Sequence, residues 1–312
     1  MTPILQWLAM LVYLIVVPPL VIGIIRKTKA RLQNRVGPPL FQFLFDLIKL
    51  CQKSETVSDT ICWIFRSTSA INFAIMLVLA VLLPWTGFKP QIHGADLFFV
   101  VYAFALAKFF TILAALDSGS SFGAFGSSRE VFLSALVEPP VILSLAALGI
   151  GVQSSDLYQA FSFESLSMAH QSALWGLVGI SIVMSSLVEL SRMQIDDPTT
   201  HLELTMVHEA MTIENSGRNL ALTEYAHVLR MTILFGLTFQ CFLHAVPWAY
   251  TAGPLLIGVI GIIGVLLVAF GVGIFEGLAV KLQWRKNPDF IAYSLTMSLL
   301  ACFIAVGGGI VK

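Results

Sequence analysis

Long apolar runs alternate with short polar segments along the whole chain. An apolar run of about 20 residues spans a bilayer when it is helical, because each residue adds about 1.5 Å. Windows of about 19 residues therefore predict eight membrane-spanning helices. They lie near Ile4–Ile25, Ile61–Trp85, Asp96–Leu116, Arg129–Val152, His170–Leu190, Thr223–Trp248, Pro254–Val280 and Pro288–Ile310.

The composition agrees with a membrane protein. Of the 312 residues, 57% are hydrophobic and only 12% are charged, which is more apolar surface than a soluble core of this length could bury. We expect an all-α, polytopic protein in which residues 1–312 form one integral membrane domain. The net charge of zero argues against a nucleic-acid partner. The first apolar run lacks a basic leader and a cleavage site, and we interpret it as a retained span.

The four cysteines, Cys51, Cys62, Cys241 and Cys302, stand far apart, and no two of them form a C-x-x-C pair. This spacing predicts neither an iron–sulfur ligand set nor a zinc site. We therefore expect no cofactor in this chain, and any redox centre would belong to a partner subunit.

Basic residues predict the orientation, because loops that stay in the cytoplasm keep their Lys and Arg. Two lie on one side, Lys89 and Lys312. Fourteen lie on the other, which predicts that both termini are outside. These are Arg26, Lys27, Lys29, Arg31, Arg35, Lys49, Lys53, Arg66, Arg129, Arg192, Arg218, Lys281, Arg285 and Lys286.

The first cytoplasmic loop begins with the basic run RKTKARLQNRVGPP. Apolar residues at helical spacing then predict an amphipathic helix that lies flat on the membrane, with Asp46, Lys49 and Lys53 toward water. These apolar residues are Leu40, Phe43, Leu44, Leu47, Ile48 and Leu50. The pattern fits a simple anchor and a binding element equally well.

The segment from Val188 to Tyr225 is acidic and lies between two apolar runs. Its carboxylates would suit proton loading or the docking of a basic partner, although an ordinary solvated loop is also charged. His201, Glu203, His208 and Glu209 include two histidines on one helical face, but the HExxH pattern is missing. This disfavours a metal site. The acidic residues are Glu189, Asp196, Asp197, Glu203, Glu209, Glu214 and Glu224.

Two ionisable residues lie well inside predicted spans. A charge at mid-bilayer costs about 2.5–3.5 kcal/mol on insertion scales, so Lys108 and Glu138 should face protein or water. Pro139 and Pro140 follow Glu138, and they should kink the helix and leave polar backbone beside the carboxyl group. We predict that Glu138 is a proton-relay group; the alternative is a buried structural pair between Glu138 and Lys108.

The sixth span opens with Glu224, His227 and Arg230, which are spaced three apart and share one side of the helix. His227 beside a carboxylate could shuttle protons near neutral pH, or it could be a hydrogen-bonded packing histidine. Glu276 near the inner end of the seventh span is either functional or snorkels to the interface. His244 is expected at the membrane interface.

Two loops carry a family resemblance. RLQNRVGPP, with Gln42, Asp46, Lys49, Leu50 and Lys53 after it, resembles the first cytoplasmic loop of complex I subunit 1. The acidic segment is similar to a later loop of that family. The residues that match it in order are Glu189, Arg192, Asp196, Pro198, Glu203, Ser216 and Gly217.

The stretch LDSGSSFGAFGSSREVFLSALVEPP is similar to the formate hydrogenlyase and hydrogenase 4 branch of that family. The resemblance implies a non-catalytic subunit that couples electron transfer to proton or sodium movement. It would anchor a hydrogenase-like large subunit and an iron–sulfur small subunit, beside antiporter-like membrane subunits, in the plasma (inner) membrane of a prokaryote. Iron–sulfur clusters, and in some such complexes a nickel–iron centre, would lie in the partners.

The resemblance also suggests site residues. The implied proton path consists of Lys108, Glu138, Glu189, Glu203, Glu224 and His227. The candidates for partner docking are Arg31, Arg35, Asp46, Arg129, Glu130, Arg192, Asp196 and Asp197. The chain departs from the family pattern at Gln194, Thr199 and His201, which removes part of the expected carboxylate set and weakens the case for a bound quinone.

Two other functions fit parts of the pattern. A subunit of a quinone-reducing, NADH dehydrogenase-like complex would share both loops. A standalone secondary transporter would share the many spans, but such proteins are built from inverted repeats with broken helices. The chain shows no convincing repeat beyond the pairs Pro18, Pro19 and Pro139, Pro140.

Overall fold

The computed structural model describes residues 3–58, 61–85, 94–161, 172–192, 207–246, 254–279 and 286–310. These ranges are almost entirely helical, and eight of their helices are long and apolar enough to cross a membrane, as predicted. The eight long helices are α1 (Pro3–Leu32), α3 (Trp63–Leu82), α4 (Leu97–Asp117), α5 (Ser121–Val152), α7 (Ser172–Glu189), α9 (Gly217–His244), α10 (Pro254–Leu278) and α11 (Asn287–Ile310). The shorter ones are α2 (Gln42–Gln52), α6 (Leu157–Ala160) and α8 (His208–Thr212).

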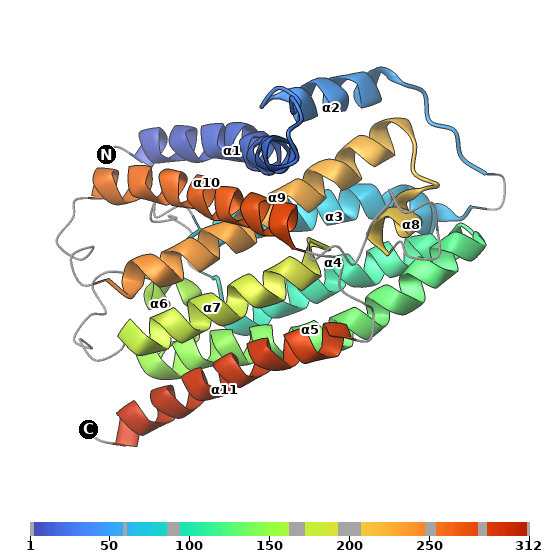
Figure 1. The fold of residues 1–312 in the computed structure, drawn as a ribbon. Coiled ribbons are helices and arrows are strands. Elements are labelled where there is room, and N and C mark those ends of the chain that lie inside the picture. Colours follow the sequence, from blue (N-terminus) through green and yellow to red (C-terminus); the bar gives the residue numbers. More distant parts are fainter. Residues whose placement is uncertain are drawn as a thin grey trace.

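Helix α9 is the central element of the bundle. It contacts α1, α2, α3, α7 and α10, and 78% of its most apolar stretch is buried. Helices α1 and α10 pack together at one edge, and α11 packs on α5 and α7 at the opposite edge (Figure 1). The two chain ends lie at one end of the bundle, and α8 lies near the other end (Figure 1). The charged side chains within this buried stretch therefore face protein, whereas Arg218 in the first turn of α9 is exposed.

Helices α1 and α5 exceed their predicted lengths the most. Helix α5 begins at Ser121, eight residues before the predicted start, and only residues 118–120 separate it from α4. Its small residues allow a close approach: a Cβ at Gly126 would lie 2.7 Å from the carbonyl oxygen of Val207. Helix α1 continues to Leu32 and ends with Lys29 and Arg31, which suit the negative end of the helix dipole. The paired prolines stay inside α1 and α5.

The predicted amphipathic helix is α2. Phe43 is buried, and α2 contacts α9 and α1, whereas Phe45 and Ile48 are exposed on the other side. Lys49 and Lys53 are exposed, as expected. The predicted outward Asp46 is instead half-buried, and its carboxylate accepts a hydrogen bond of 2.9 Å from the Gln42 amide.

Asp117, the last residue of α4, caps the start of the neighbouring helix α3. The Asp117 carboxylate accepts hydrogen bonds from the backbone N–H groups of Cys62 (3.0 Å) and Phe65 (3.3 Å), at the start of α3. Helix starts leave such N–H groups unsatisfied, so this cap stabilises α3 from another helix. Hydrogen bonding and charge from Asp117, with a small contribution from burial, raise the pKa of the exposed Cys62 thiol.

We expect Asp117→Asn to speed alkylation of Cys62 by a maleimide. The thiolate is the reacting form, and a raised pKa depletes it at neutral pH, so lowering the pKa increases the rate. The measurement is the alkylation rate at pH 7.5 in variants that keep Cys62 alone. A matched protein that keeps only the exposed Cys51 should show no change, and an unchanged Cys62 rate would contradict the assigned contact.

Candidate functional site

A buried ion cluster joins three membrane-spanning helices. Glu189 at the end of α7 accepts hydrogen bonds from Lys108 of α4 and from Arg230 of α9, one on each carboxylate oxygen. The three side chains are only 7–14% exposed. Lys108 also donates to the Ser134 hydroxyl at 3.0 Å and lies 4.0 Å from the Glu130 carboxylate. With Glu130, two cations balance two anions, so the buried group is neutral overall.

Arg230 is held by a second contact, because its guanidinium lies over the ring of Phe104 at 5.5 Å from the centroid. A cation over an aromatic face is stabilised by the ring quadrupole. The guanidinium therefore has a fixed place between α4 and α7. This fixes the direction of the field that it exerts on Glu189.

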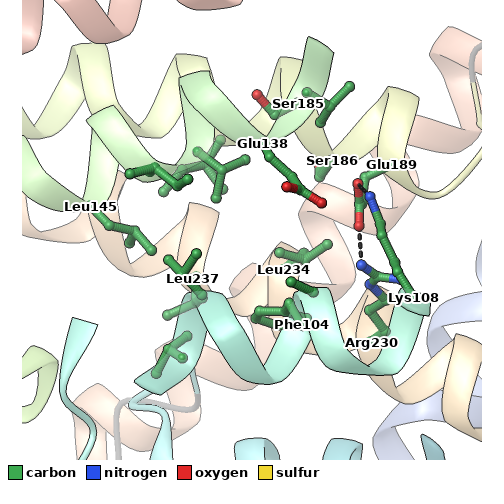
Figure 2. Close-up of a pocket in the computed structure, with 17 residues that line it drawn as sticks. Phe104, Lys108, Glu138, Leu145, Ser185, Ser186, Glu189, Arg230, Leu234 and Leu237 are labelled. Atoms are coloured by element: carbon green, nitrogen blue, oxygen red, sulfur yellow. Dashed lines mark hydrogen bonds and ion pairs between the residues drawn. The ribbon is translucent and has the colours of Figure 1, made fainter. Parts of the chain in front are cut away.

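A cavity of about 60 Å³ lies beside the cluster, between α4, α5, α7 and α9. That volume has room for a few water molecules, which could hydrogen-bond to the few polar groups on the wall. Most of the wall is apolar, from residues such as Phe104, Leu234 and Leu237 (Figure 2). Its polar residues are Lys108, Glu138, Ser185, Ser186, Glu189 and Arg230.

Glu138 lines this cavity, and its carboxylate faces the side where Lys108, Glu189 and Arg230 meet (Figure 2). Within the described ranges, no hydrogen bond or ion pair joins that carboxylate to another residue, and Lys108 pairs with Glu189 instead. The alternative of a structural Glu138–Lys108 pair is therefore wrong. Lys108 does not pair with Glu138 because Glu189 already offers it a charged partner.

A second ion cluster lies between α1, α10 and the turn after α7. Glu276 accepts a 2.7 Å hydrogen bond from Lys29 and lies 3.8 Å from a guanidinium nitrogen of Arg192. Glu276 therefore does not snorkel to water. Burial lowers the pKa of the Arg192 guanidinium, while the negative charges of Glu276, Glu224 and Glu209 act in the opposite direction.

The predicted stripe on α9 faces the interior, and each of its last two members has an aromatic or charged partner. His227 stacks on His208 of α8, with ring centroids 4.5 Å apart and an interplanar angle of 28°. Arg192 and Arg230 both act electrostatically on His227. The sequence pattern singles out His208 only as a possible metal ligand, because no local spacing links it to His227.

His244 is not an exposed interfacial residue. Its ring is 3% exposed, stacks on Trp175 with centroids 4.7 Å apart, and meets Phe161 edge-on. Its two nitrogens lie 2.8 Å from the Gln240 carbonyl oxygen and 3.1 Å from that of Phe161. Two aromatic rings and two carbonyl groups therefore enclose the side chain at the last residue of α9.

A buried hydroxyl network ties the cavity to α11. Ser185, which lines the cavity, lies 2.7 Å from the Ser294 hydroxyl, and Ser294 donates at 3.0 Å to the Ser181 carbonyl oxygen. Ser181 in turn accepts a 2.9 Å hydrogen bond from Ser144 of α5. Small hydroxyl residues let helices approach closely within a membrane. The network holds α5, α7 and α11 together beside the cavity.

The family model described as NADH dehydrogenase matches residues 5–307. The chain belongs to this family. Among curated relatives, it is 30% identical to formate hydrogenlyase subunit 4 of Escherichia coli (strain K12), over 92% of this chain and 96% of that protein. It is 32% identical to hydrogenase-4 component C of the same organism, over 76% of this chain and 74% of that protein. These relatives confirm the branch that the sequence motifs indicated.

A solved structure supports the fold of this family member. The membrane-bound sulfane sulfur reductase, an archaeal respiratory membrane complex, contains a chain that matches 97% of this one with a TM-score of 0.76. That match covers 99% of the other chain, at 19% identity. It supports the eight-helix architecture.

The two loops that resemble the family's loops meet in space. Ser216 donates to the Thr56 carbonyl oxygen at 2.7 Å and accepts from the Thr56 N–H at 2.9 Å. Gly217 has φ +53, and a Cβ there would lie 2.9 Å from the Ser54 carbonyl oxygen. The Ser-Gly pair thus docks the loop after α2 onto the start of α9, since only glycine fits this conformation and space without strain.

The candidates for partner docking separate into two groups. Arg31 and Arg35 are exposed and remain available to a partner. Glu130 faces Lys108, and Arg192 faces Glu276, with side chains 13% and 17% exposed, so neither fits a docking role. Arg129 has interactions of its own. Glu203, Asp196 and Asp197 lie outside the described residues, as do Gln194, Thr199 and His201.

Across the ranges that the structure describes, no three His, Cys, Asp or Glu side chains are grouped so that they could hold a metal ion. Most of the buried charged groups of this NADH dehydrogenase family member are instead paired with one another, and Glu138 is the exception among those that line the cavity. The chemistry that the arrangement supports is proton transfer and electrostatic control.

Proposed function

We propose that this chain is the membrane-anchoring and ion-coupling subunit of a multi-subunit, hydrogenase-related redox complex. Its relatives named above are subunits of formate hydrogenlyase and hydrogenase-4. The proposed partners are a hydrogenase-like large subunit, an iron–sulfur small subunit and antiporter-like membrane subunits. The complex would lie in the plasma membrane of a prokaryote, with both termini of this chain on the outer face. The redox centres would belong to the partners.

The observation that carries the coupling role is the Glu138 carboxylate, which has no ion-pair partner among the described residues and faces a cavity beside a buried ion cluster. Because no cation holds Glu138, its carboxylate can exchange a proton with water that the cavity could hold. The proposed path runs from the acidic segment, with Glu203, through Glu224 and His227 to Glu189 and Lys108, and then to Glu138.

The ion cluster suits such a path because its charges are balanced and buried. A proton that arrives near Glu189 weakens its attraction for Lys108 and Arg230, and the interaction between charges is strong where water is scarce. The freed cations then repel a proton on nearby groups and attract the Glu138 carboxylate. Redox events in a partner could drive this change through the cytoplasmic loops.

Purification of a tagged chain from gently solubilised membranes tests the assignment to a complex. We expect iron–sulfur partner subunits to co-purify, visible as protein-bound iron and sulfide in the same peak. A control tag on an unrelated polytopic membrane protein should recover no iron. Recovery of this chain alone, with transport of a solute after reconstitution, would contradict the proposal and favour the standalone transporter.

A further inference from the structure

We propose that His208 is a second proton-relay residue, and that the stacked pair His208–His227 carries one proton at a time between the two ion clusters. This inference rests on the proposed function and assigns a role to a residue that the sequence pattern does not connect to the path. The species that the pair binds is a proton, which water or a neighbouring carboxyl group delivers.

The position of the pair is the first support. Arg192, which acts on His227, lies 3.8 Å from Glu276 in the second ion cluster. Arg230, which also acts on His227, is bonded to Glu189 in the first cluster. Each ion cluster therefore holds a guanidinium group whose charge reaches the His227 ring. Both histidine side chains are half-buried within the chain.

The second support is that α8 holds His208 in register. Helix α8 has only five residues, and it packs on α5 and α4. Val207, Ala210 and Met211 are at most 4% exposed, and the nearest approach to Gly126 leaves no room for a side chain there. Such tight packing fixes the His208 ring over His227 without help from a hydrogen bond within the pair.

The charges around the histidine pair limit the number of protons that it can carry. The groups that act on it from the packed elements are Arg192 and Arg230, while Glu209 and Glu224 act on Arg192. A second proton would place two imidazolium rings face to face beside two guanidinium groups, where like charges repel. One ring can accept a proton from a carboxyl group of Glu224 or Glu209 through water and become imidazolium. It can then pass that proton through water to the other ring, which releases it toward Glu189, so that both rings end neutral and no net proton accumulates.

The experiment uses the intact complex in sealed membrane vesicles and compares His208→Phe with His208→Ala. Phenylalanine keeps the stacked ring but carries no proton. We expect His208→Phe to lower coupled proton movement by about 100-fold, the low end for loss of a positioned proton-transfer group. Reduction of a soluble redox dye by the partner subunits should persist. Added imidazole should restore proton movement in His208→Ala and leave His208→Phe unchanged.

Two results would overturn the inference. Normal proton movement in His208→Phe would show that the His208 ring only packs. Lost proton movement in His208→Ala that imidazole does not restore would also show that the ring has only a packing role. The reference variant Glu138→Gln separates this failure from failure of the proposed function. If Glu138→Gln blocks proton movement and His208→Phe does not, only the His208 role is wrong. If both variants show normal proton movement in an assembled complex, the coupling role itself is wrong.

Discussion

Glu189→Gln is expected to destabilise the protein by about 3–5 kcal/mol, because it leaves two buried cations without their shared carboxylate. Lys108 would retain the Ser134 hydroxyl at 3.0 Å and Glu130 at 4.0 Å, and Arg230 would keep its contact with Phe104. Both side chains are nearly inaccessible to water, so solvent would compensate little. The measurement is the thermal unfolding temperature of the purified complex, together with the amount of chain in the membrane.

The control is the double variant Glu189→Gln with Lys108→Met. It removes one anion and one cation, and the Met side chain fills similar space, so part of the lost stability should return. A single variant as stable as the wild type would show that Glu189 does not hold the two cations together. A double variant no more stable than the single one would show that the charge balance is not the cause.

Gly236→Leu is expected to cost about 1–3 kcal/mol or to prevent assembly, because the site has no space for a side chain. A Cβ at Gly236 would lie 2.6 Å from the carbonyl oxygen of Trp85 and 2.7 Å from its Cβ. Trp85 cannot move away: its ring nitrogen donates to Ala80 at 2.9 Å, and its ring meets Tyr13 edge-on. The measurement is the unfolding temperature of the complex.

Gly271→Leu serves as the matched control, since nothing lies within 4 Å of a Cβ at that position of α10. It changes the same residue type in a helix of the same bundle, and its effect should be small. Equal losses in the two variants would contradict the packing of α9 against Trp85.

Much of the fold follows from the sequence, since a run of about 20 apolar residues can satisfy its backbone in lipid only as a helix. The eight long helices were predicted on that ground, and α2 was predicted from the helical spacing of its apolar residues. The helix starts were less predictable: the Ser- and Gly-rich stretch before Arg129 looks like a loop, yet it begins α5 because Gly126 packs against Val207. Only a tertiary contact distinguishes these two outcomes.

The site was predictable by residue type and not by pairing. An ionisable side chain within a span must face protein or water, which singles out Lys108 and Glu138. The partner of Lys108 is Glu189, 81 residues away, and the partner of Glu276 is Lys29, 247 residues away. No local spacing encodes such pairs. The His208–His227 stack was missed for the same reason.

The helical stripe on α9 shows what periodicity can supply. Spacing of three placed Glu224, His227 and Arg230 on one side, and the structure confirms that His227 and Arg230 face neighbouring helices. Periodicity predicts the side of the helix on which a residue lies, but it does not predict how deeply the side chain is buried or which residue it contacts. The depth comes from α9 being the central helix, which depends on contacts with five other helices.

Proton movement by the assembled complex with Glu138→Gln tests the central claim most directly. Glutamine keeps the shape of the side chain and its place in the cavity but cannot exchange a proton, and Glu138→Asp, which keeps the carboxylate, is the matched control. Proton uptake per electron pair is measured in sealed vesicles. We expect a fall of about 100-fold for glutamine, as for loss of a positioned proton-transfer group, and partial retention for aspartate. Normal proton uptake with Glu138→Gln in a fully assembled, electron-transferring complex would contradict the account.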